Sequence, residues 1–472
     1  MSSLFGTDGV RGVANRDLTP ELAFRIGRAH GHLLSPPGRR PRVAIGRDTR
    51  VSGQMLEAAY VAGLCSSGAD VILLGIMPTP GVAWLVVQLQ ADGGAVISAS
   101  HNPVQDNGIK LLNDQGFKLS DEEEETLEAF VTRADELPRP IGADLGRVES
   151  RSEEAEDLYV DHLFRSAPSR LDGLEVVLDC ANGAACRVAP RVFEALGARA
   201  TVLSARPDGI NINRDCGSTH PEEMLRTVCQ TRSRLGLAFD GDADRCLASD
   251  EEGNLVDGDP MLLLFARWLR QHGRLPGDIL VTTVMANFGL EEALRREGIG
   301  MVRTPVGDRY VLAEMRRCGG TLGGEQSGHI IFLDHATTGD GVLTGVILAS
   351  IVHQATEPLS CMVRAMTRMP QVLVNVPVRD KSLWDKDPEI AQAVAQGQDR
   401  LRERGRILVR PSGTENLVRI MLEGPDREEL DRLVGEIRQV MEERLAVQGT
   451  ACCHGSTPDR EHPSEGNPGS PP

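Results

Sequence analysis

Ser100 stands where a hydroxyl can do chemistry, at the end of an apolar run that predicts a buried strand. Residues 94–97 (Gly-Ala-Val-Ile) lead into residues 98–103 (Ser-Ala-Ser-His-Asn-Pro), and open α/β sheets bind ligands at the carboxyl ends of their strands. The segment lacks the Gly-x-Ser-x-Gly pattern of a hydrolase, which disfavours acyl transfer. A serine beside a metal ion can instead carry a phosphoryl group. We expect His101 to orient this loop rather than to act as a base.

Asp240, Asp242 and Asp244 alternate along the chain after a second apolar run, so a turn there can direct all three carboxylates at one cation. A purely carboxylate set favours Mg²⁺ or Mn²⁺ over zinc, and carboxylates this close need a cation to stay ionised. An EF-hand is the alternative, since Glu251 falls at its twelfth position. That alternative requires Gly at the sixth position, where this chain has Arg245, and a helix before the loop rather than a strand.

Two more polar loops follow. Glu325, Ser327 and His329 lie in Gly-Glu-Gln-Ser-Gly-His, where a carboxylate and a hydroxyl suit the vicinal hydroxyls of a sugar. For His329, acid–base chemistry and a hydrogen bond that holds the loop both stay open. The fourth loop, Arg-Pro-Ser-Gly-Thr-Glu, has the side-chain donors, backbone N–H groups and Arg charge of a phosphate cradle, although an ordinary hairpin is the alternative. Its candidate ligands are Arg410, Ser412, Gly413, Thr414 and Arg419.

These loops, together with residues 5–12 (Phe-Gly-Thr-Asp-Gly-Val-Arg-Gly), resemble the α-D-phosphohexomutase superfamily. The five motifs occur in that family's order, and the resemblance covers about residues 4 to 445. The opening segment and Gln326 are most similar to the members that act on glucosamine phosphates. One such motif alone is weak support, whereas five in order are specific.

The resemblance also implies roles for single residues. It places Arg11 and Lys110 around a phosphoserine at Ser100, where they assist proton transfer, with His329 as a further catalytic group. It implies metal ligation by Ser100 and the three aspartates. It assigns the sugar 3- and 4-hydroxyls to Glu325 and Ser327, and further substrate contacts to the remaining set, which is Arg245, Arg410, Ser412, Gly413, Thr414 and Arg419.

The activity expected from this resemblance is the interconversion of glucosamine 6-phosphate and glucosamine 1-phosphate, feeding UDP-N-acetylglucosamine and cell-wall precursor synthesis. It implies one Mg²⁺ per active site, phosphorylation of Ser100, and glucosamine 1,6-bisphosphate as intermediate and activator. Mutase action on glucose or mannose phosphates is the alternative, because no sequence feature visibly recognises the 2-amino group. A non-catalytic sugar-phosphate or Ca²⁺-binding regulator is a third class, which Ser100 and the intact aspartates disfavour.

Composition limits the partners of this 472-residue chain. A formal net charge of −17 argues against nucleic acid, which needs a basic face. A phosphorylated small molecule needs only a few converging Arg and N–H groups. The sequence shows neither an apolar run of membrane-spanning length nor a signal-peptide pattern, so we expect a cytoplasmic protein without a membrane partner. Its ten cysteines form no C-x-x-C pair, which predicts reduced thiols. A homodimer stays open.

Alternating strands and amphipathic helices predict an α/β fold built of βαβ units. We expect three similar mixed-sheet α/β domains and a smaller α+β C-terminal domain, in which a tight loop joins two strands near Arg410 and Arg419. Ser120 and the acidic run after it predict a helix start. The predicted parts are domain I with the phosphoserine loop (1–155), domain II with the metal loop (156–257), domain III with the sugar loop (258–368), domain IV with the phosphate loop (369–447) and a disordered tail (448–472).

Overall fold

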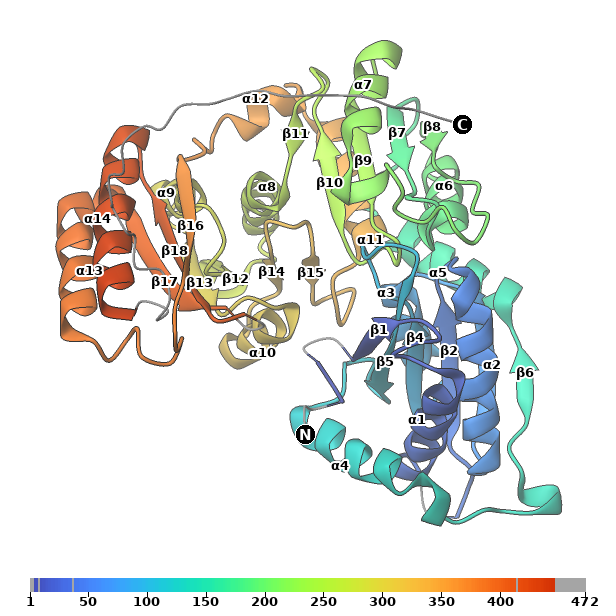
Figure 1. The fold of residues 1–472 in the computed structure, drawn as a ribbon. Helices are drawn as coiled ribbons and strands as arrows, with labels where there is room; N and C mark the ends of the chain where they lie inside the picture. The colour runs from blue at the N-terminus through green and yellow to red at the C-terminus, as the bar shows by residue number, and fades with distance from the viewer. Residues whose placement is uncertain (1–3, 7–8, 36–37, 413–414, 446–472) are drawn as a thin grey trace, which may run out of the picture. The chain divides into compact units, whose positions relative to one another are not determined.

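The computed structural model describes residues 4–6, 9–35, 38–412 and 415–445. The chain divides into two compact units, Met1–Arg368 and Met369–Pro472, and each is described by itself (Figure 1). The division falls where the sequence predicts the start of the C-terminal domain. Two candidate ligands, Gly413 and Thr414, and the predicted disordered tail 448–472 lie outside the described residues.

The first sheet of the larger unit has the strand order β1-β5-β4-β2-β3-β6. Alternate residues of β2 face opposite sides, because Val43 and Ile45 share a core with α1 and α2 while Ala44 packs with α3. Helices therefore cover both faces, as parallel strands require. The elements are β1 Val10–Val13, α1 Pro20–Leu33, β2 Arg42–Arg47, α2 Val51–Ser66, β3 Asp70–Ile76, α3 Thr79–Gln88, β4 Gly93–Ile97, β5 Asp106–Asn113, α4 Asp121–Thr132, the short 3₁₀ helices Ala134–Glu136 and Gly142–Asp144, and β6 Val148–Ser150.

The second sheet has the order β11-β10-β9-β7-β8, with α7 packed on one face and α6 on the other. Residues 155 and 156, on either side of a predicted domain boundary, both lie inside α5, which packs against α3 and α6. The elements are α5 Ser152–Ser166, β7 Glu175–Asp179, α6 Ala185–Ala195, β8 Arg199–Leu203, the 3₁₀ helix Gly217–Thr219, α7 Glu222–Thr231, β9 Leu235–Phe239, β10 Cys246–Ser249 and β11 Leu255–Val256.

The third sheet has the order β13-β12-β14-β15. Its faces are covered by α10 on one side and by α8 and α9 on the other. The elements are α8 Gly258–Gln271, the 3₁₀ helix Pro276–Asp278, β12 Ile279–Thr283, α9 Phe288–Arg296, β13 Gly300–Thr304, α10 Asp308–Cys318, β14 Leu322–Gly324, β15 Ile330–Phe332, α11 Gly341–Gln354 and α12 Leu359–Val363.

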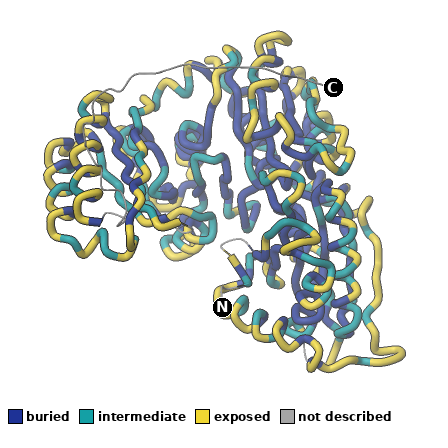
Figure 2. The backbone as a smooth tube through the Cα atoms, in the orientation of Figure 1, coloured by how far each residue is buried: buried dark blue, intermediate teal, exposed yellow. Residues whose placement is uncertain are grey.

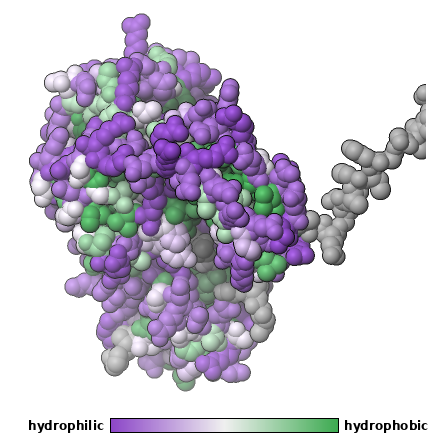
Figure 3. Space-filling model, turned by 90° about the vertical axis from the view of Figure 1, so that its left-hand side faces the viewer, coloured by the Kyte–Doolittle hydropathy of each residue, from purple (hydrophilic) through white to green (hydrophobic). Residues whose placement is uncertain are grey.

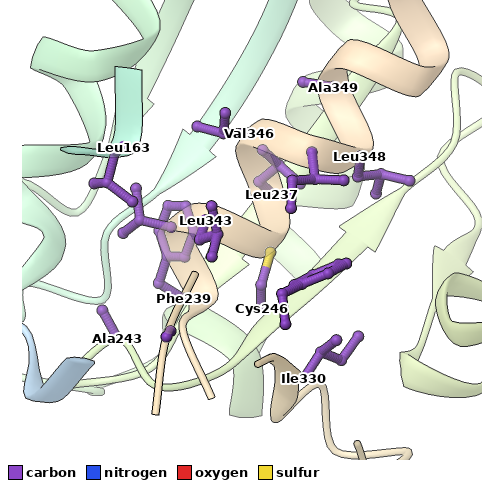
Figure 4. Close-up of a cluster of buried hydrophobic side chains, with 14 of the residues drawn as sticks. Leu163, Leu237, Phe239, Ala243, Cys246, Ile330, Leu343, Val346, Leu348 and Ala349 are labelled. Atoms are coloured by element: carbon purple, nitrogen blue, oxygen red, sulfur yellow. The ribbon is translucent and has the colours of Figure 1, made fainter. Parts of the chain in front are cut away.

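One helix, α11, joins the second and third sheets into a continuous core. It follows the third sheet in the chain but packs on β9 and β10 of the second. Figure 4 shows Leu343 and Val346 of α11 beside Leu237 and Phe239 of β9, and Figure 2 shows the helix and these strands buried. An apolar sequence on all sides of the helix is what this position requires.

The smaller unit is an antiparallel sheet of order β16-β18-β17, with α13 and α14 sharing its core. β17 and β18 form the predicted pair of strands joined by a short loop. This α+β arrangement completes the predicted fold class, which is confirmed. The elements are β16 Gln371–Pro377, α13 Pro388–Leu401, the 3₁₀ helix Arg402–Arg404, β17 Arg406–Pro411, β18 Leu417–Glu423 and α14 Arg427–Leu445.

The same turn recurs in each sheet of the larger unit. β4, β9 and β14 run parallel to their inner neighbours, and each is followed by an antiparallel partner, which is β5, β10 and β15 respectively. The loops that contain Ser100, the three aspartates and Glu325 are therefore hairpin connections. The sequence predicts the strands before the first two loops but not the returning strands, which are short or contain polar residues.

Local signals set several boundaries. At α4 the Ser120 hydroxyl accepts from the Glu123 N–H and the Glu123 carboxylate accepts from the Ser120 N–H, so the predicted helix start is confirmed as a capping box. None of the described helices combines the length and hydropathy that a membrane crossing requires. The face in Figure 3 is mostly hydrophilic, with hydrophobic residues in separate patches.

The buried ring of His30 in α1 predicts a pH-dependent stability. Its Nδ1 lies 2.6 Å from the hydroxyl of Tyr60, and burial lowers the pKa of His30 from 6.5 to about 3. Below pH 6.5 the unfolded chain binds a proton that the folded protein does not, so stability falls as the pH falls toward 3. Between pH 6.5 and 5 the loss is roughly 2 kcal/mol, at ~1.4 kcal/mol per pH unit.

We expect His30→Gln to remove this part of the acid sensitivity. The measurement is the melting temperature of each protein at pH 7 and pH 5, with the exposed His220→Gln as control. The drop on acidification should be smaller for His30→Gln than for the wild type and the control. Equal drops in all three proteins would contradict a neutral buried ring.

Candidate active site

Ser100 lies in the hairpin connection between β4 and β5, with its side chain buried. Its φ of 51° is in the left-handed region, which non-glycine residues adopt at a cost when a structure holds them there. The Ser100 Oγ donates to Asp240 Oδ2 at 2.5 Å. The structure thus brings the predicted nucleophile into direct contact with the predicted metal loop, although 140 residues separate them in the chain.

The three aspartates occupy the turn between β9 and β10. One carboxylate oxygen from each of the three lies within 4.8 Å of the other two, and all three residues are buried. Burial and the charges of Asp244 and Asp242 raise the pKa of Asp240 well above its usual range. Because a strand and not a helix precedes the turn, the EF-hand alternative has no structural support.

Lys110 of β5 and Thr79 of α3 connect the first sheet and its helix to the aspartate turn by hydrogen bonds. The Lys110 Nζ donates to Asp242 Oδ2 at 2.9 Å and lies 3.6 Å from Asp244 Oδ2. Thr79, at the start of α3, donates its hydroxyl to Asp242 Oδ2 at 2.6 Å and its N–H to the Asp242 carbonyl. Sequence analysis missed Thr79, since a threonine after a proline signals only a helix start.

The donor set fits a hard divalent cation. Burial opposes ionisation of Asp244, but Lys110, His329 and Arg245 together hold its pKa well below the usual range. Asp242 Oδ1 and Asp244 Oδ1 are buried and accept no hydrogen bond from any described residue. Buried carboxylate oxygens without donors are costly, and a cation bound by oxygen ligands removes that cost.

His329 lies at the end of the Glu325 loop, next to the aspartate turn. Its Nδ1 is 3.7 Å from Asp244 Oδ1, and its Nε2 is 3.6 Å from Asp308 Oδ2. Burial opposes a charged ring, but the nearby carboxylates of Asp244, and then Asp308, raise the pKa of His329. The Gly339 N–H donates to Nε2 at 3.0 Å, which places the proton of the neutral ring on Nδ1.

Gly339 has a steric role as well. A Cβ at this position would lie 2.5 Å from the His329 ring, so only glycine lets the backbone approach the imidazole this closely. Gly339 was not predicted from the sequence, because its importance comes only from its distance to His329.

The Glu325 carboxylate is held in place by hydrogen bonds to both of its oxygens. Its Oε1 accepts from the Gly307 N–H at 3.0 Å, and its Oε2 lies 3.4 Å from the Ser327 hydroxyl. The Lys118 Nζ donates to Asp308 Oδ2 at 2.6 Å, and Lys118 was not among the predicted site residues. A cavity of about 240 Å³ is lined by Arg11, Ser100, Lys118, Asp244, Arg245, Val306, Gly307, Asp308, Glu325 and His329.

The cavity collects residues from all three sheets of the larger unit, and six of the predicted site residues line it. Ser327 is not among the lining residues, and neither is Lys110, which lies behind Asp242. His101 lies beside Ser100, with its Nδ1 3.4 Å from the Ser100 Oγ. Burial, with the charges of Arg245 and Arg11, lowers the pKa of His101 to about 4, so its ring is neutral at physiological pH.

The fourth predicted loop belongs to the smaller unit. Arg410 of β17 lies directly opposite Arg419 of β18, and burial followed by the Arg419 charge lowers the pKa of Arg410. Like charges in cross-strand positions destabilise a sheet, and an anion relieves the repulsion. Ser412 is buried, and the Lys381 Nζ donates to its carbonyl at 2.6 Å. The predicted ligands Gly413 and Thr414 lie outside the described residues.

Comparison with protein families finds four matches in chain order. They are the domains of phosphoglucomutase/phosphomannomutase, with alpha/beta/alpha domain I over residues 2–138, domain II over 157–253, domain III over 257–369 and the C-terminal domain over 373–440. Together the matches cover most of the chain.

The sequence is also similar to that of several phosphoglucosamine mutases over nearly its whole length. The phosphoglucosamine mutase of Moorella thermoacetica is 55% identical over 441 residues, which is 93% of this chain and 99% of that protein. That of Pelotomaculum thermopropionicum is 53% identical over 446 residues, 94% of this chain and 100% of that protein.

Solved structures share the fold. A phosphoglucomutase/phosphomannomutase family protein from Burkholderia thailandensis has a TM-score of 0.78 at 26% identity, covering 94% of this chain and 98% of that one. An N-acetylphosphoglucosamine mutase from Aspergillus fumigatus, in complex with GlcNAc-6P and magnesium, has a TM-score of 0.64 at 17% identity, covering 93% and 95% of the two chains.

The aspartate turn predicts divalent-cation binding that depends on Asp242. We expect Asp242→Asn to weaken Mg²⁺ binding by about tenfold or more, because the charge of the ligands sets the affinity of such sites. Mg²⁺ should raise the melting temperature of the wild type by mass action but not that of the variant. Without Mg²⁺ the variant should melt no lower than the wild type, since one buried charge has been removed from a crowded group.

Titration calorimetry with MgCl₂ and thermal melting measure the two effects. The control is Asp334→Asn, which changes a carboxylate paired with Arg274 far from the aspartate turn in sequence and 44% exposed. Equal Mg²⁺ affinities for wild type and Asp242→Asn would show that the turn does not hold the cation.

Proposed function

The chain belongs to the phosphoglucomutase/phosphomannomutase family, and we propose that it interconverts glucosamine 6-phosphate and glucosamine 1-phosphate. The relatives above 50% identity that match it over nearly their full length are phosphoglucosamine mutases, which favours this substrate over glucose or mannose phosphates. The observation that best supports phosphoryl transfer is the contact between the Ser100 Oγ and Asp240, beside a cavity that Ser100 lines.

Ser100 is the proposed carrier of the phosphoryl group. When phosphorylated, it transfers the group to the free hydroxyl of the bound monophosphate; the bond from phosphorus to the Ser100 Oγ breaks and a bond to the sugar oxygen forms. The sugar hydroxyl loses a proton and the serine oxygen gains one. The resulting 1,6-bisphosphate turns round in the site, and its other phosphoryl group returns to Ser100 by the same step in reverse.

Asp240, Asp242 and Asp244, with the Ser100 side chain, are the proposed ligands of one Mg²⁺. When bound, such an ion neutralises charge on the phosphoryl oxygens. The two carboxylate oxygens that accept no hydrogen bond from described residues support this assignment. The Lys110 ammonium, 2.9 Å from Asp242 Oδ2, balances part of the charge of the same turn.

Arg11, Lys110 and His329 are the groups we propose for proton transfer and charge stabilisation. Arg11 and His329 line the cavity beside Ser100, and Lys110 is buried against two of the aspartates. General acids and bases work best when their pKa lies near the working pH. Of these groups, only a histidine has an unperturbed pKa in that range. Burial opposes a charged His329 ring, but the carboxylates of Asp244 and Asp308 raise its pKa, and the Gly339 N–H holds Nε2 as an acceptor.

Sugar recognition is assigned to Glu325, Ser327 and Arg245. Glu325 and Arg245 line the cavity, and Glu325 is oriented by the Gly307 N–H. A carboxylate fixed by a backbone donor can accept from two neighbouring hydroxyls without losing its position. Ser327 contributes by its contact with Glu325.

The loop between β17 and β18 is proposed to bind the phosphate that is not being transferred. Its candidate ligands are Arg410, Ser412, Gly413, Thr414 and Arg419. The facing guanidinium groups of Arg410 and Arg419 support an anion site. The Arg419 Nε is buried and has no hydrogen-bond acceptor among the described residues, so an oxygen of a phosphate would satisfy it.

The remaining expectations stay proposals. We propose a cytoplasmic enzyme that uses glucosamine 1,6-bisphosphate as intermediate and activator. We propose neither a nucleic-acid partner nor a membrane partner. A homodimer stays open.

Replacing Ser100 should separate chemistry from binding. We expect Ser100→Ala to lose turnover by several orders of magnitude, as nucleophile removal does in enzymes with covalent intermediates, while calorimetry still detects glucosamine 6-phosphate binding. Intact-mass spectrometry should find a phosphate on wild-type Ser100 and none on the variant. The exposed Ser382→Ala is the control.

Turnover of Ser100→Ala within about tenfold of wild type, only ~1.4 kcal/mol of barrier, would rule out the covalent role. The same assay run on glucose 1-phosphate distinguishes the hexose alternative, which predicts an equal or higher kcat/KM for glucose than for glucosamine phosphate.

Arg419→Ala should weaken binding of both monophosphate isomers. Charge-assisted hydrogen bonds contribute ~1.5–3 kcal/mol, so KM should rise roughly ten- to hundredfold. Phosphate occupancy of Ser100 should not change. The control is Arg404→Ala in the same unit, where the guanidinium is 61% exposed and 3.9 Å from Glu429. Unchanged KM values for Arg419→Ala would identify this loop as an ordinary hairpin.

A further inference from the structure

A buried ion pair lies beneath the loop that carries Ser100. Asp48 and Arg50 follow β2, and both side chains have no solvent exposure. The Arg50 Nε donates to Asp48 Oδ2 at 2.9 Å, and the Arg50 N–H donates to Asp48 Oδ1 at 2.8 Å. A buried guanidinium needs hydrogen-bond acceptors for its N–H groups. The acceptors of the Arg50 Nη1 and Nη2 groups show which part of the protein this ion pair supports.

Those partners are backbone carbonyls of the Ser100 loop. The Arg50 Nη2 donates to the carbonyls of Ser100 and Asn102 at 2.9 and 2.8 Å, and Nη1 donates to that of Pro103 at 2.6 Å. Asn213, which follows β8 in the chain, adds a second donor to the Ser100 carbonyl at 2.9 Å. Both acceptor positions of that carbonyl are therefore occupied.

The N–H of Ser100 is held by the other member of the pair. It donates to the Ser98 hydroxyl at 3.0 Å, and this hydroxyl donates to Asp48 Oδ2 at 2.6 Å. The Ser100 carbonyl is thus hydrogen-bonded to Arg50 directly, and the Ser100 N–H is linked to Asp48 through the Ser98 hydroxyl. The Ser100 Oγ is directed instead to Asp240.

We propose that Asp48 and Arg50 are positioning residues that hold the Ser100 Oγ against the aspartate turn for phosphoryl transfer. This inference rests on the proposed covalent role of Ser100. Ser100 has a φ of 51°, a conformation that persists only where the surroundings fix it, and the pair with Ser98 and Asn213 supplies that fixation. The loop must receive and release a phosphoryl group without moving, because displacements of about 1 Å cost ~10²-fold in rate.

A second largely buried ion pair, at the end of β2, offers a control for the burial of charge alone. Arg47, the last residue of β2, lies 3.2 Å from Glu57 of α2, with side chains 15% and 17% exposed. The Arg47 Nη1 also donates to the carbonyl of Asp48 at 3.3 Å, whereas the carbonyls of the Ser100 loop accept from Arg50. Arg47→Lys is therefore a matched control for Arg50→Lys.

The experiment compares Arg50→Lys and Ser98→Ala with Arg47→Lys and wild type in the full chain. Lysine keeps the charge of Arg50 but cannot donate to three carbonyls and Asp48 together. Ser98→Ala removes only the bridging hydroxyl, so it tests the same unit if Arg50→Lys does not fold. The readouts are melting temperature, kcat and KM for glucosamine 6-phosphate, and Ser100 phosphate after incubation with glucosamine 1,6-bisphosphate.

We expect kcat to fall about 10²-fold in Arg50→Lys and about tenfold in Ser98→Ala, where a single bridging group is lost. KM should stay within about threefold of wild type, since the substrate contacts are intact, and Ser100 should gain phosphate more slowly. Arg47→Lys should match the wild type in kcat. A purely structural role would lower the melting temperature and leave kcat per folded molecule unchanged.

Two results would overturn the inference in different ways. Wild-type kcat and phosphate uptake in folded Arg50→Lys and Ser98→Ala would contradict the positioning role alone. A wild-type protein that turns over substrate without ever carrying phosphate on Ser100 would contradict the proposed covalent function, and the inference would fall with it.

Discussion

The mutual repulsion of three buried carboxylates is the constraint around which the larger unit is organised. Asp240, Asp242 and Asp244 lie within 4.8 Å of one another away from solvent, an arrangement that cannot persist without compensating positive charge and donors. The fold supplies these from separate segments, which are Lys110 of β5, Thr79 of α3, the Ser100 hydroxyl and Arg245. Asp242 Oδ1 and Asp244 Oδ1, which accept no hydrogen bond within the described part of the chain, are suited to a metal ion.

This charge distribution reconciles a strongly acidic chain with a substrate that carries a phosphate. The net charge of −17 determines the electrostatic potential far from the protein, whereas substrate binding depends on the local potential at the site. In the larger unit, the lining of the cavity places the cationic side chains of Arg11, Lys118 and Arg245 beside the carboxylates of Asp244, Asp308 and Glu325. In the smaller unit, Arg410 and Arg419 are held side by side against their own repulsion.

Repetition of one turn explains how distant loops come to form one cavity. In each sheet of the larger unit, a strand parallel to its inner neighbour is followed by an antiparallel return, and the connection carries site residues. The same core continues through α11, which packs on the second sheet although it follows the third. Because α5 also packs against neighbours on both sides of it, the sheets of this unit are parts of one packed body.

The sequence by itself determined the family, the fold class, the reaction class and the candidate residues of the four loops. It did so because strand-end polar motifs such as the aspartate turn are local in the chain, and their residue types limit the chemistry. Family, fold and reaction class are confirmed by the matches over the whole chain. The roles of single residues and the domain limits remain predictions.

Only the tertiary structure decided which groups support those loops. Asp48, Arg50 and Gly339 have no distinctive pattern in the sequence, and their importance comes from distances to Ser100 and His329 across the fold. The returning strands β5, β10 and β15 were missed for a related reason. They are short or contain polar residues, and pairing with a neighbouring strand, rather than their own hydrophobic pattern, makes them strands.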